Sequence, residues 1–289
     1  MVAEVIEQLA PGRGGIFVDC TVGHGGHARA ILDAGASRVI ALDRDPNALR
    51  HAAGVLAPYG PRAELVHSDY RRLTEILDAC GVGAVEGILA DLGVSSMQLD
   101  EAGRGFSFRR DEPLDMRMDP TSGPTAADAI RDADERTLAD VIYEFGEERH
   151  ARRIARAIVE TRGRTAVDTT GRLADVVRRA VPKRGYSRID PATRTFQAIR
   201  IWVNRELEGL DIFLTQAAAR LRPGGRMAII AFHSLEDRIV KHTLRSLQTA
   251  GDIGLIVRTK RPVVPSEAEV QRNPRARSAK LRAAERTAA

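Results

Sequence analysis

Short apolar runs alternate with helical patterns over the first hundred residues of the chain. A stripe at Val2, Val5, Ile6 and Leu9 predicts an opening helix that ends at Pro11-Gly12. We expect strands at the four apolar runs that follow, Ile16–Val18, Val39–Leu42, Glu64–Val66 and Gly87–Ala90. Strands that alternate with helices in this way are typical of a parallel α/β sheet.

The alternation stops after the fourth run. Residues 103–124 are rich in Gly, Pro, Asp and Arg without a clear period, which predicts an ordered loop or linker. Residues 125 to about 190 show only helical periods, with a first apolar stripe over 138–145, a second over 154–159 and a further helix over 173–180. We therefore expect a helical domain at residues 103–205, inserted into an α/β domain formed by residues 1–102 and 206–289.

One long helix is predicted to lead from the insert back into the α/β domain. Asp190 and Pro191 are residue types favoured at the N-cap and the first helical position. Apolar residues then recur every three or four positions from Phe196 to Leu221. Beyond Pro223-Gly224-Gly225 we expect a buried strand at Met227–Phe232 and a helix over 237–247. Two further strands, Leu255–Arg258 and Ala279–Ala283, are expected to pair antiparallel at a sheet edge.

The composition is that of a globular protein with an ordinary core. Of 289 residues 43% are hydrophobic, no apolar run approaches the roughly 18 residues of a membrane span, and no signal segment opens the chain, so we expect a cytoplasmic protein without a membrane partner. Cys20 and Cys80 form no C-x-x-C pair, and His24 and His27 have no third ligand at a usual spacing. We therefore expect no metal site.

Positive charge is concentrated in one part of the chain. The formal net charge is only +5, but arginine and lysine clearly outnumber the acids in residues 146–205. Such a local excess indicates a polyanionic partner. A set of solvated helical surfaces would account for the same composition equally well.

The loop after the first apolar run has the glycine spacing of a nucleotide-binding turn. Gly23, Gly25 and Gly26 precede a helix, and Asp43 ends the second run, 20 residues after Gly23. Asp19, however, lies between the strand and the glycines, where its charge would oppose a pyrophosphate. This acid favours S-adenosylmethionine, which carries an ammonium and a sulfonium. We expect Asp19 to bind the ammonium, the glycines to give the methionine moiety access to the backbone, and Asp43 to bind the ribose hydroxyls.

Two further strand ends carry polar groups. Asp69 and Tyr70 follow the third run, where adenine would lie, so Tyr70 would pack on the ring and Asp69 would face its exocyclic amine. The loop Asp91–Gln98 follows the fourth run beside the reactive end of the cofactor and offers a carboxylate to a substrate amine. Each acid alone would also fit a helix cap or a turn, but the whole set at the strand ends favours ligand binding.

Several longer motifs, each different from the others, are distributed from about residue 16 to the C-terminus. They are Asp91–Gln98, Arg104–Phe108, Pro113–Asp119, Gly146–Arg149, Pro191–Ile201, Phe232–Arg238 and Asn273–Ser278. Together they resemble the bacterial 16S rRNA (cytosine-N4)-methyltransferase family. The resemblance implies a class I S-adenosylmethionine-dependent methyltransferase fold, which is a Rossmann-like, mostly parallel seven-stranded sheet, with an inserted helical domain. It also implies S-adenosyl-L-methionine as methyl donor and a cytidine in the decoding region of 16S rRNA as acceptor.

The resemblance also assigns site residues, position by position. The implied cofactor-binding set is Gly25, Gly26, His27, Asp43, Tyr70, Asp91 and Gln98. The chain departs from the family in two ways. It lacks a His-x-Pro-Val-Leu-Leu-like opening, and it has a tyrosine at position 70, where the family often has phenylalanine.

The chemistry of a cytosine amine narrows the catalytic candidates. The lone pair of this amine is delocalised into the ring, so the site must orient the amine and accept its hydrogen bonds. Orientation lowers the activation free energy by up to about 7–11 kcal/mol. Asp91 is the first candidate for the acceptor. His233 is the second catalytic candidate, because it follows a strand end and is able to stack on the base; Phe232, Phe106 and Phe108 are alternatives for stacking.

Arginines of the insert are expected to contact the partner, which is 16S rRNA or the small ribosomal subunit. The candidates are Arg149, Arg152, Arg153, Arg194 and Arg200. Some of them must form structural ion pairs instead.

Two rival functions stay open. Asp19 and the lack of a second substrate domain oppose an NAD-type oxidoreductase, and the intact glycines and Asp91 oppose a non-catalytic ribosome-assembly protein. The sequence distinguishes neither naked rRNA from an assembled subunit as substrate nor a monomer from a homodimer.

Overall fold

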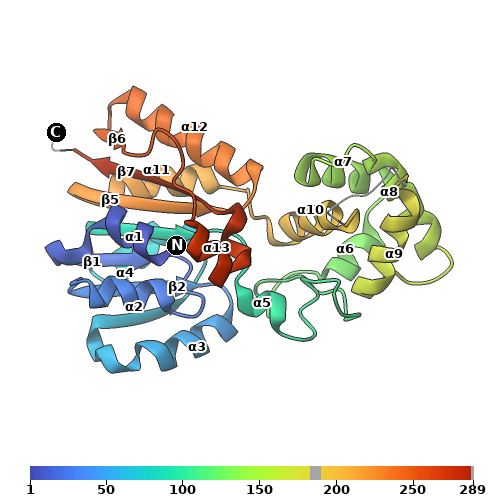
Figure 1. Cartoon of the computed structure of the whole chain (residues 1–289), viewed down its shortest axis with the longest axis horizontal. Coiled ribbons are helices and arrows are strands. Elements are labelled where there is room, and N and C mark those ends of the chain that lie inside the picture. The colour runs from blue at the N-terminus through green and yellow to red at the C-terminus, as the bar shows by residue number, and fades with distance from the viewer. Residues whose placement is uncertain (183–189, 288–289) are drawn as a thin grey trace. The chain divides into compact units, whose positions relative to one another are not determined.

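The computed structural model describes residues 1–182 and 190–287. The chain forms two compact units, one of Met1–Gly93 with Leu207–Ala289 and one of Val94–Glu206 (Figure 1). The first division therefore falls after Gly93, whereas the sequence placed it after residue 102. Among the described residues, no helix has the length and apolar character needed to cross a membrane.

The first unit is built on a seven-stranded sheet with the order β3-β2-β1-β4-β5-β7-β6. The strands are β1 (Ile16–Asp19), β2 (Arg38–Asp43), β3 (Ala63–His67), β4 (Val85–Asp91), β5 (Leu221–Ala231), β6 (Leu255–Val257) and β7 (Lys280–Arg286). The first five pair in parallel, and β7 runs antiparallel to both β5 and β6. This is the class I methyltransferase topology, and it confirms the expected parallel sheet with an antiparallel pair at one edge.

Helices cover both faces of this sheet. They are α1 (Val2–Leu9), α2 (Gly26–Asp33), α3 (Pro46–Leu56), α4 (Leu73–Ala79), α11 (Leu210–Arg220), α12 (Ser234–Ala250) and α13 (Glu267–Arg272), with 3₁₀ turns η1 (Pro11–Arg13), η2 (Ala57–Arg62), η3 (Tyr70–Arg72) and η4 (Pro274–Ser278). Successive strand residues point to opposite faces. Val18 and Ile88 accordingly pack with α4, α11 and α12, whereas Phe17 and Leu89 pack with α1, α2 and α3.

The second unit is helical, as expected. It contains α5 (Ser96–Asp100), α6 (Ala126–Asp132), α7 (Glu135–Gly146), α8 (Ala151–Arg162), α9 (Thr170–Ala180) and α10 (Ala192–Asn204). The predicted apolar stripes of α7 and α8 lie in one buried cluster with α9 and α10. Residues 183–189, which the sequence included in the helical segment, lie outside the described residues.

Side-chain hydrogen bonds order the long loop before α6. Asn204, at the end of α10, accepts a hydrogen bond from the Met118 backbone N–H (2.7 Å) and donates one to the Met116 carbonyl (2.7 Å). Leu114 and Met116 are almost fully buried in the helical core. The loop therefore belongs to the folded unit, in agreement with the prediction of an ordered segment.

The prediction of one continuous helix from Pro191 to Leu221 is wrong. Helix α10 ends at Asn204, and α11 begins at Leu210. Between them, Arg205 (φ 52°) and Gly209 (φ 68°) adopt left-handed backbone conformations that interrupt the helix. The apolar stripe continues across this break because its first half packs into the helical core and its second half into the core beside the sheet.

Candidate active site

The carboxyl ends of three parallel strands bring Asp19, Asp43 and Asp91 to one edge of the sheet. Asp19 on β1 is in register with Ala41 on β2 and with Leu89 on β4. Both neighbouring strands therefore end two residues beyond the level of Asp19, at Asp43 and Asp91. Ligands of open α/β sheets bind at this edge.

The glycine turn is tied to the end of β2 by the Asp43 carboxylate. Its Oδ2 accepts a hydrogen bond from the Gly23 N–H and its Oδ1 one from the Asp45 N–H, both at 2.9 Å. Gly23 (φ 50°) and Gly25 (φ 78°) have backbone conformations that favour glycine, and α2 begins directly afterwards at Gly26. Each Asp43 oxygen can accept one further hydrogen bond, so the side chain is suited to two neighbouring hydroxyls.

Among the described residues, neither Asp19 nor Asp91 forms an ion pair with a Lys or Arg side chain. Asp19 is fully buried, and burial, reinforced by the charges of Asp91 and Asp43, raises its pKa to about 7. Burial raises the pKa of Asp91 to about 7 as well; the N-terminal ammonium lowers it in part, and the charge of Glu236 adds a smaller upward contribution. The Asp19 Oδ2 and the Asp91 Oδ1 are buried and accept no hydrogen bond from the described residues. Buried carboxylate oxygens in this state fit a cationic ligand.

Thr21 connects these two acids, and the sequence analysis did not single it out. Its N–H donates to the Asp19 Oδ1 (3.2 Å), and its Oγ1 accepts a hydrogen bond from the Asp91 N–H (2.7 Å). The residue stands between the first strand and the glycines. A hydroxyl at that place in a nucleotide-binding turn was the available signal.

His27 is a neutral neighbour of Asp91. Its Nδ1 lies 3.6 Å from the Asp91 Oδ2, and its side chain is 16% exposed. Burial lowers the pKa of His27 to about 4, so this contact is no ion pair at neutral pH. The ring of His24 packs instead against His51, with 5.8 Å between the ring centroids. The two histidines of the H-x-x-H pair thus have different surroundings.

Tyr70 and Asp69 follow β3, as the sequence indicated. The Tyr70 ring packs against Phe213 on α11, with the centroids 4.6 Å apart. Arg71 already engages both oxygens of the Asp69 carboxylate through its Nε (2.9 Å) and its Nη2 (2.6 Å), and Arg44 adds a longer contact of 3.4 Å. Burial opposes the charge of Asp69, but the hydrogen bonds from Arg71 outweigh it and lower the pKa of Asp69. The expected contact between Asp69 and an adenine amine therefore has two arginines as competitors.

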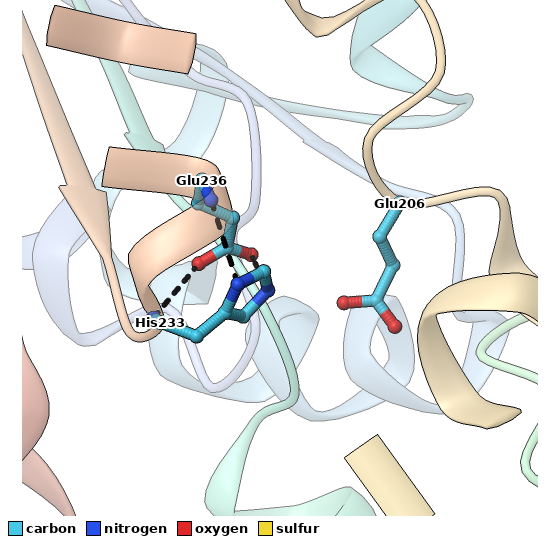
Figure 2. Close-up of side chains that lie close together, drawn as sticks. All are labelled: Glu206, His233 and Glu236. Carbon is cyan, nitrogen blue, oxygen red and sulfur yellow. Dashed lines mark hydrogen bonds and ion pairs between the residues drawn. The ribbon is translucent and has the colours of Figure 1, made fainter. Parts of the chain in front are cut away.

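His233 follows β5 and caps helix α12, where it is held by Glu236 (Figure 2). Its Nδ1 accepts a hydrogen bond from the Glu236 N–H (3.4 Å), and its Nε2 lies 3.2 Å from the Glu236 Oε1. The Glu236 Oε2 also accepts a hydrogen bond from the Phe232 N–H (2.9 Å). Because Nδ1 is an acceptor, the proton of a neutral His233 ring belongs on Nε2.

Comparison with known proteins identifies the family of this chain. The model of the MraW methylase family matches residues 1–287. The chain belongs to the MraW methylase family. It is 53% identical to Ribosomal RNA small subunit methyltransferase H of Bradyrhizobium diazoefficiens, over 99% of this chain and 90% of that protein. The protein of the same name from Deinococcus radiodurans is 51% identical, over 100% and 89% respectively.

One solved structure with a related description is an rRNA methylase from Streptococcus thermophilus. It is 14% identical, covers 99% of this chain and 92% of its own, and has a TM-score of 0.43. The family membership itself, which rests on the sequence matches, confirms the resemblance found in the motifs.

The remaining candidates of this MraW-family chain lie in the helical unit. Gln98 is buried and forms a capping box with Ser95, whose N–H donates to the Gln98 Oε1 (2.9 Å). Phe108 packs edge-on against Phe196, with centroids 4.7 Å apart, and Phe106 is 8% exposed. Both phenylalanines thus serve the core of the insert. Of the stacking candidates, we therefore favour His233 over these two.

The five candidate arginines of the insert differ in their partners. Arg200 forms a bidentate ion pair with Glu206 (2.9 and 2.8 Å), and Arg194 lies 3.7 Å from Glu148. The Nε of Arg149 donates to the ring of His150 (3.2 Å). Arg152 and Arg153 are exposed on α8 and have no ion pair within the described ranges. Of the five candidates, these two are thus exposed arginines whose charge no described acid neutralises.

Proposed function

We propose that this protein transfers a methyl group from S-adenosyl-L-methionine to the N4 amine of a cytidine in the decoding region of 16S rRNA. Membership of the MraW methylase family supports methyl transfer, and the names of the relatives support small-subunit rRNA as substrate. The single observation that carries the cofactor is the pair of buried carboxylate oxygens, the Asp19 Oδ2 and the Asp91 Oδ1, that have no partner among the described residues.

The residues at the sheet edge fit the parts of this cofactor. Asp19 and Asp91 offer negative charge to its ammonium and sulfonium, and Asp43 offers two acceptors to the ribose. The turn at Gly25, Gly26 and His27 offers backbone access, and a side chain at Gly25 would be strained by its φ of 78°. We assign adenine to Tyr70 and keep Gln98 as a further contact. When bound, S-adenosylmethionine supplies an electrophilic methyl group on a positively charged sulfur.

Asp91 and His233 would then prepare the nucleophile. The ionised Asp91 accepts a hydrogen bond from the N4 amine, which directs the nitrogen lone pair away from the ring. As N4 gains the methyl group, it becomes strongly acidic and loses a proton, which Asp91 accepts. A weak base is sufficient for this proton, so orientation contributes the larger share of the rate enhancement. His233 provides a flat ring, held by Glu236, on which the cytosine can stack.

RNA binding is assigned to the arginine-rich insert. Extrusion of a paired or stacked cytidine costs a few kcal/mol, which contacts with neighbouring phosphates offset. Arg152 and Arg153 are the proposed contacts. They stand side by side at the start of α8, between buried residues Ala151 and Ile154 that hold the helix in the core.

The rival functions explain less of the site. An NAD-type oxidoreductase would place a pyrophosphate beside Asp19 and Asp91, which would leave both acids without a counter-charge. A non-catalytic assembly protein has no need of a carboxylate with a pKa near neutrality at the reactive end of the site.

The deciding experiment uses S-adenosylmethionine that carries a labelled methyl group. The protein is incubated with naked 16S rRNA or with small subunits, and the RNA is digested to nucleosides. We expect label in N4-methylcytidine, and far slower labelling with Asp91→Ala. Label in another nucleoside would refute the assigned acceptor. Cofactor binding without label in either substrate would favour the assembly protein, and binding of NADH instead of S-adenosylmethionine in equilibrium dialysis would favour the oxidoreductase.

A further inference from the structure

Positive charge is not confined to the insert. Residues 238–286, which belong entirely to the methyltransferase unit, contain 12 Arg and Lys but only 4 Asp and Glu. The motif Asn273–Ser278 lies in this stretch, and no step of the proposed mechanism uses it. The three-dimensional placement of these charges therefore needs its own explanation.

Three parts of this stretch lie beside one another near His233. Lys280, the first residue of β7, is the register partner of Ala231, which precedes His233 by two residues on the neighbouring strand. The Arg258 N–H bonds to the Ala283 carbonyl (2.9 Å), and Val263 and Leu281 exchange backbone hydrogen bonds of 2.9 and 2.8 Å. Residues 259–262 therefore run along the first half of β7.

The 3₁₀ turn η4 leads directly into the same end of β7. Ala276 in the middle of the turn is 4% exposed, and the Ala279 N–H bonds to its carbonyl (2.8 Å). This anchor leaves the neighbouring Arg277 exposed, three residues before Lys280. Arg277 is thus held near the sheet edge that ends in His233.

We define the C-terminal basic edge as Lys260, Arg261, Arg277 and Lys280. Lys280 shares its acid, Asp237, with Arg282, which binds it more closely (2.6 Å against 3.5 Å). Lys260, Arg261 and Arg277 are exposed and form no ion pair with any described residue.

Nearby cations that serve the fold each contact an acid, although that acid also contacts a second positive group, Arg226 for Glu285 and the N-terminal ammonium for Glu269. Arg258 pairs with Glu285 at 2.7 Å, and Arg272 lies 3.6 Å from Glu269. The basic edge differs from them because three of its four cations contact no acid among the described residues, and the fourth, Lys280, contacts only the acid that Arg282 already binds. Like charges that are held together repel one another, and an external polyanion relieves that repulsion.

We propose that the C-terminal basic edge binds the phosphate backbone of the RNA next to the target nucleotide, so that the methyltransferase unit holds its substrate independently of the insert. This inference rests on the proposed function, since it takes RNA as the substrate. The phosphates that flank a cytidine stacked on His233 must lie near the strand end that carries this histidine. Cations at that end are therefore placed to neutralise them.

The test compares two double variants with the same change in net charge. Arg261→Gln with Arg277→Gln removes two charges from the basic edge. Arg13→Gln with Arg222→Gln removes two from the opposite edge, because Arg13 precedes the start of β1 and Arg222 lies at the start of β5. The binding of a fragment of 16S rRNA is measured over a range of salt concentrations. Cofactor binding and the thermal midpoint are measured in parallel.

We expect the first variant alone to bind RNA several-fold more weakly. The slope of log K against log salt should become shallower by about 1.4 to 1.8, since each lost phosphate contact contributes roughly 0.7 to 0.9. Cofactor affinity and the thermal midpoint should match the wild type. A slope equal to that of the control variant would overturn the inference.

Two other outcomes have distinct meanings. If the first variant binds naked RNA normally but methylates small subunits poorly, the surface recognises a protein and the inference is wrong. If the wild-type protein itself neither binds nor methylates RNA, the proposed function fails together with the inference. Normal methylation by the wild type and by both variants, with equal salt slopes, would refute the inference alone.

Discussion

Asp19 and Asp91 of the methyltransferase unit differ from Asp128 of the insert in what surrounds their carboxylates. In the methyltransferase unit, Asp19 is fully buried and Asp91 partly buried, neither pairs with a described Lys or Arg side chain, and burial raises the pKa of each to about 7. In the insert, hydrogen bonds from Thr125 and then from Arg131 lower the pKa of Asp128 to about 2. The insert satisfies this acid internally, whereas Asp19 and Asp91 of the methyltransferase unit are in a state that a bound cation would relieve.

Arginines within the insert differ from one another in the same respect, namely whether the fold supplies an acidic partner. Within the insert, Arg117, Arg178 and Arg200 donate to acids of the same unit at distances of 2.8 to 2.9 Å. Arg152 and Arg153 are exceptions. The comparison therefore indicates that functional charges are those which the fold itself leaves unsatisfied, at a cost in stability.

The largest expected effect comes from Asp91→Ala. The loss of the proton acceptor should reduce the rate of methyl transfer by about 10²- to 10⁴-fold. RNA affinity should change less than twofold, because the phosphate contacts lie elsewhere. Single-turnover methylation and RNA binding measure the two quantities separately, and an unchanged turnover would remove Asp91 from its assigned role.

Asp19→Asn should weaken cofactor binding by about 10- to 100-fold. A hydrogen bond to a charged group contributes about 1.5–3 kcal/mol, and the amide cannot supply the charge. The asparagine Oδ1 can still accept the hydrogen bond from Thr21, so the turn should keep its shape. Calorimetric titration with S-adenosylmethionine gives the affinity, and wild-type affinity in this variant would contradict a contact with the ammonium.

The same variant should change how stability depends on pH. Asp19 keeps its proton up to about pH 7 in the folded state but ionises near its ordinary value of 3.8 in the unfolded chain. Between these values the unfolded state binds fewer protons, so the free energy of unfolding of the cofactor-free protein falls as pH rises from about 4 to about 7.

Asp19→Asn removes the contribution of Asp19 to this dependence, whereas the contribution of Asp91, whose pKa is also raised, remains. The variant should equal the wild type near pH 4 and be more stable at pH 8, by about 4 kcal/mol at most, since each pKa unit corresponds to about 1.4 kcal/mol. Urea denaturation at several pH values measures the difference. Equal stabilities at pH 8 would show that Asp19 is not held as a buried, proton-binding acid.

The smallest effect is expected from Arg152→Ala with Arg153→Ala. The slope of log K for 16S rRNA binding against log salt should become shallower by about 1.4 to 1.8. The matched control is Arg131→Ala with Arg136→Ala, because Arg131 and Arg136 are also exposed in the insert but have acidic partners, Asp128 and Asp140. If both double variants change the slope equally, the distinction between paired and unpaired arginines has no functional meaning.

Much of the fold could be predicted from the sequence because the signals are local. Every predicted strand is present, and Asp19, Asp43 and Asp91 each end one. The break at Arg205–Gly209 could not be predicted from periodicity, since the stripe on either side has the same spacing while its halves pack into different cores. Helical spacing records which side of a helix is apolar but not which core that side contacts.

The candidate site shows the same division. The glycine turn and its acids were visible in the sequence, because their types and spacing follow from the backbone conformation and from the charge of the ligand. The arginines that bind Asp69 and the carboxylate that holds His233 were not visible in the sequence. Arg71 is nevertheless only two residues from Asp69, and Glu236 only three residues from His233. Short sequence distance does not reveal which way a side chain turns.

By itself, the sequence determined the order of strands and helices, the glycine turn, the acids at the strand ends and the family. Only the tertiary structure decided which charged groups have no partner among the described residues: the Asp19 Oδ2, the Asp91 Oδ1, Arg152 and Arg153 of α8, and Lys260, Arg261 and Arg277 of the C-terminal basic edge. The physical reason is that pairing and desolvation depend on groups from distant segments. A carboxylate or guanidinium has the same formal charge in every sequence, but its environment decides whether that charge serves the fold or a ligand.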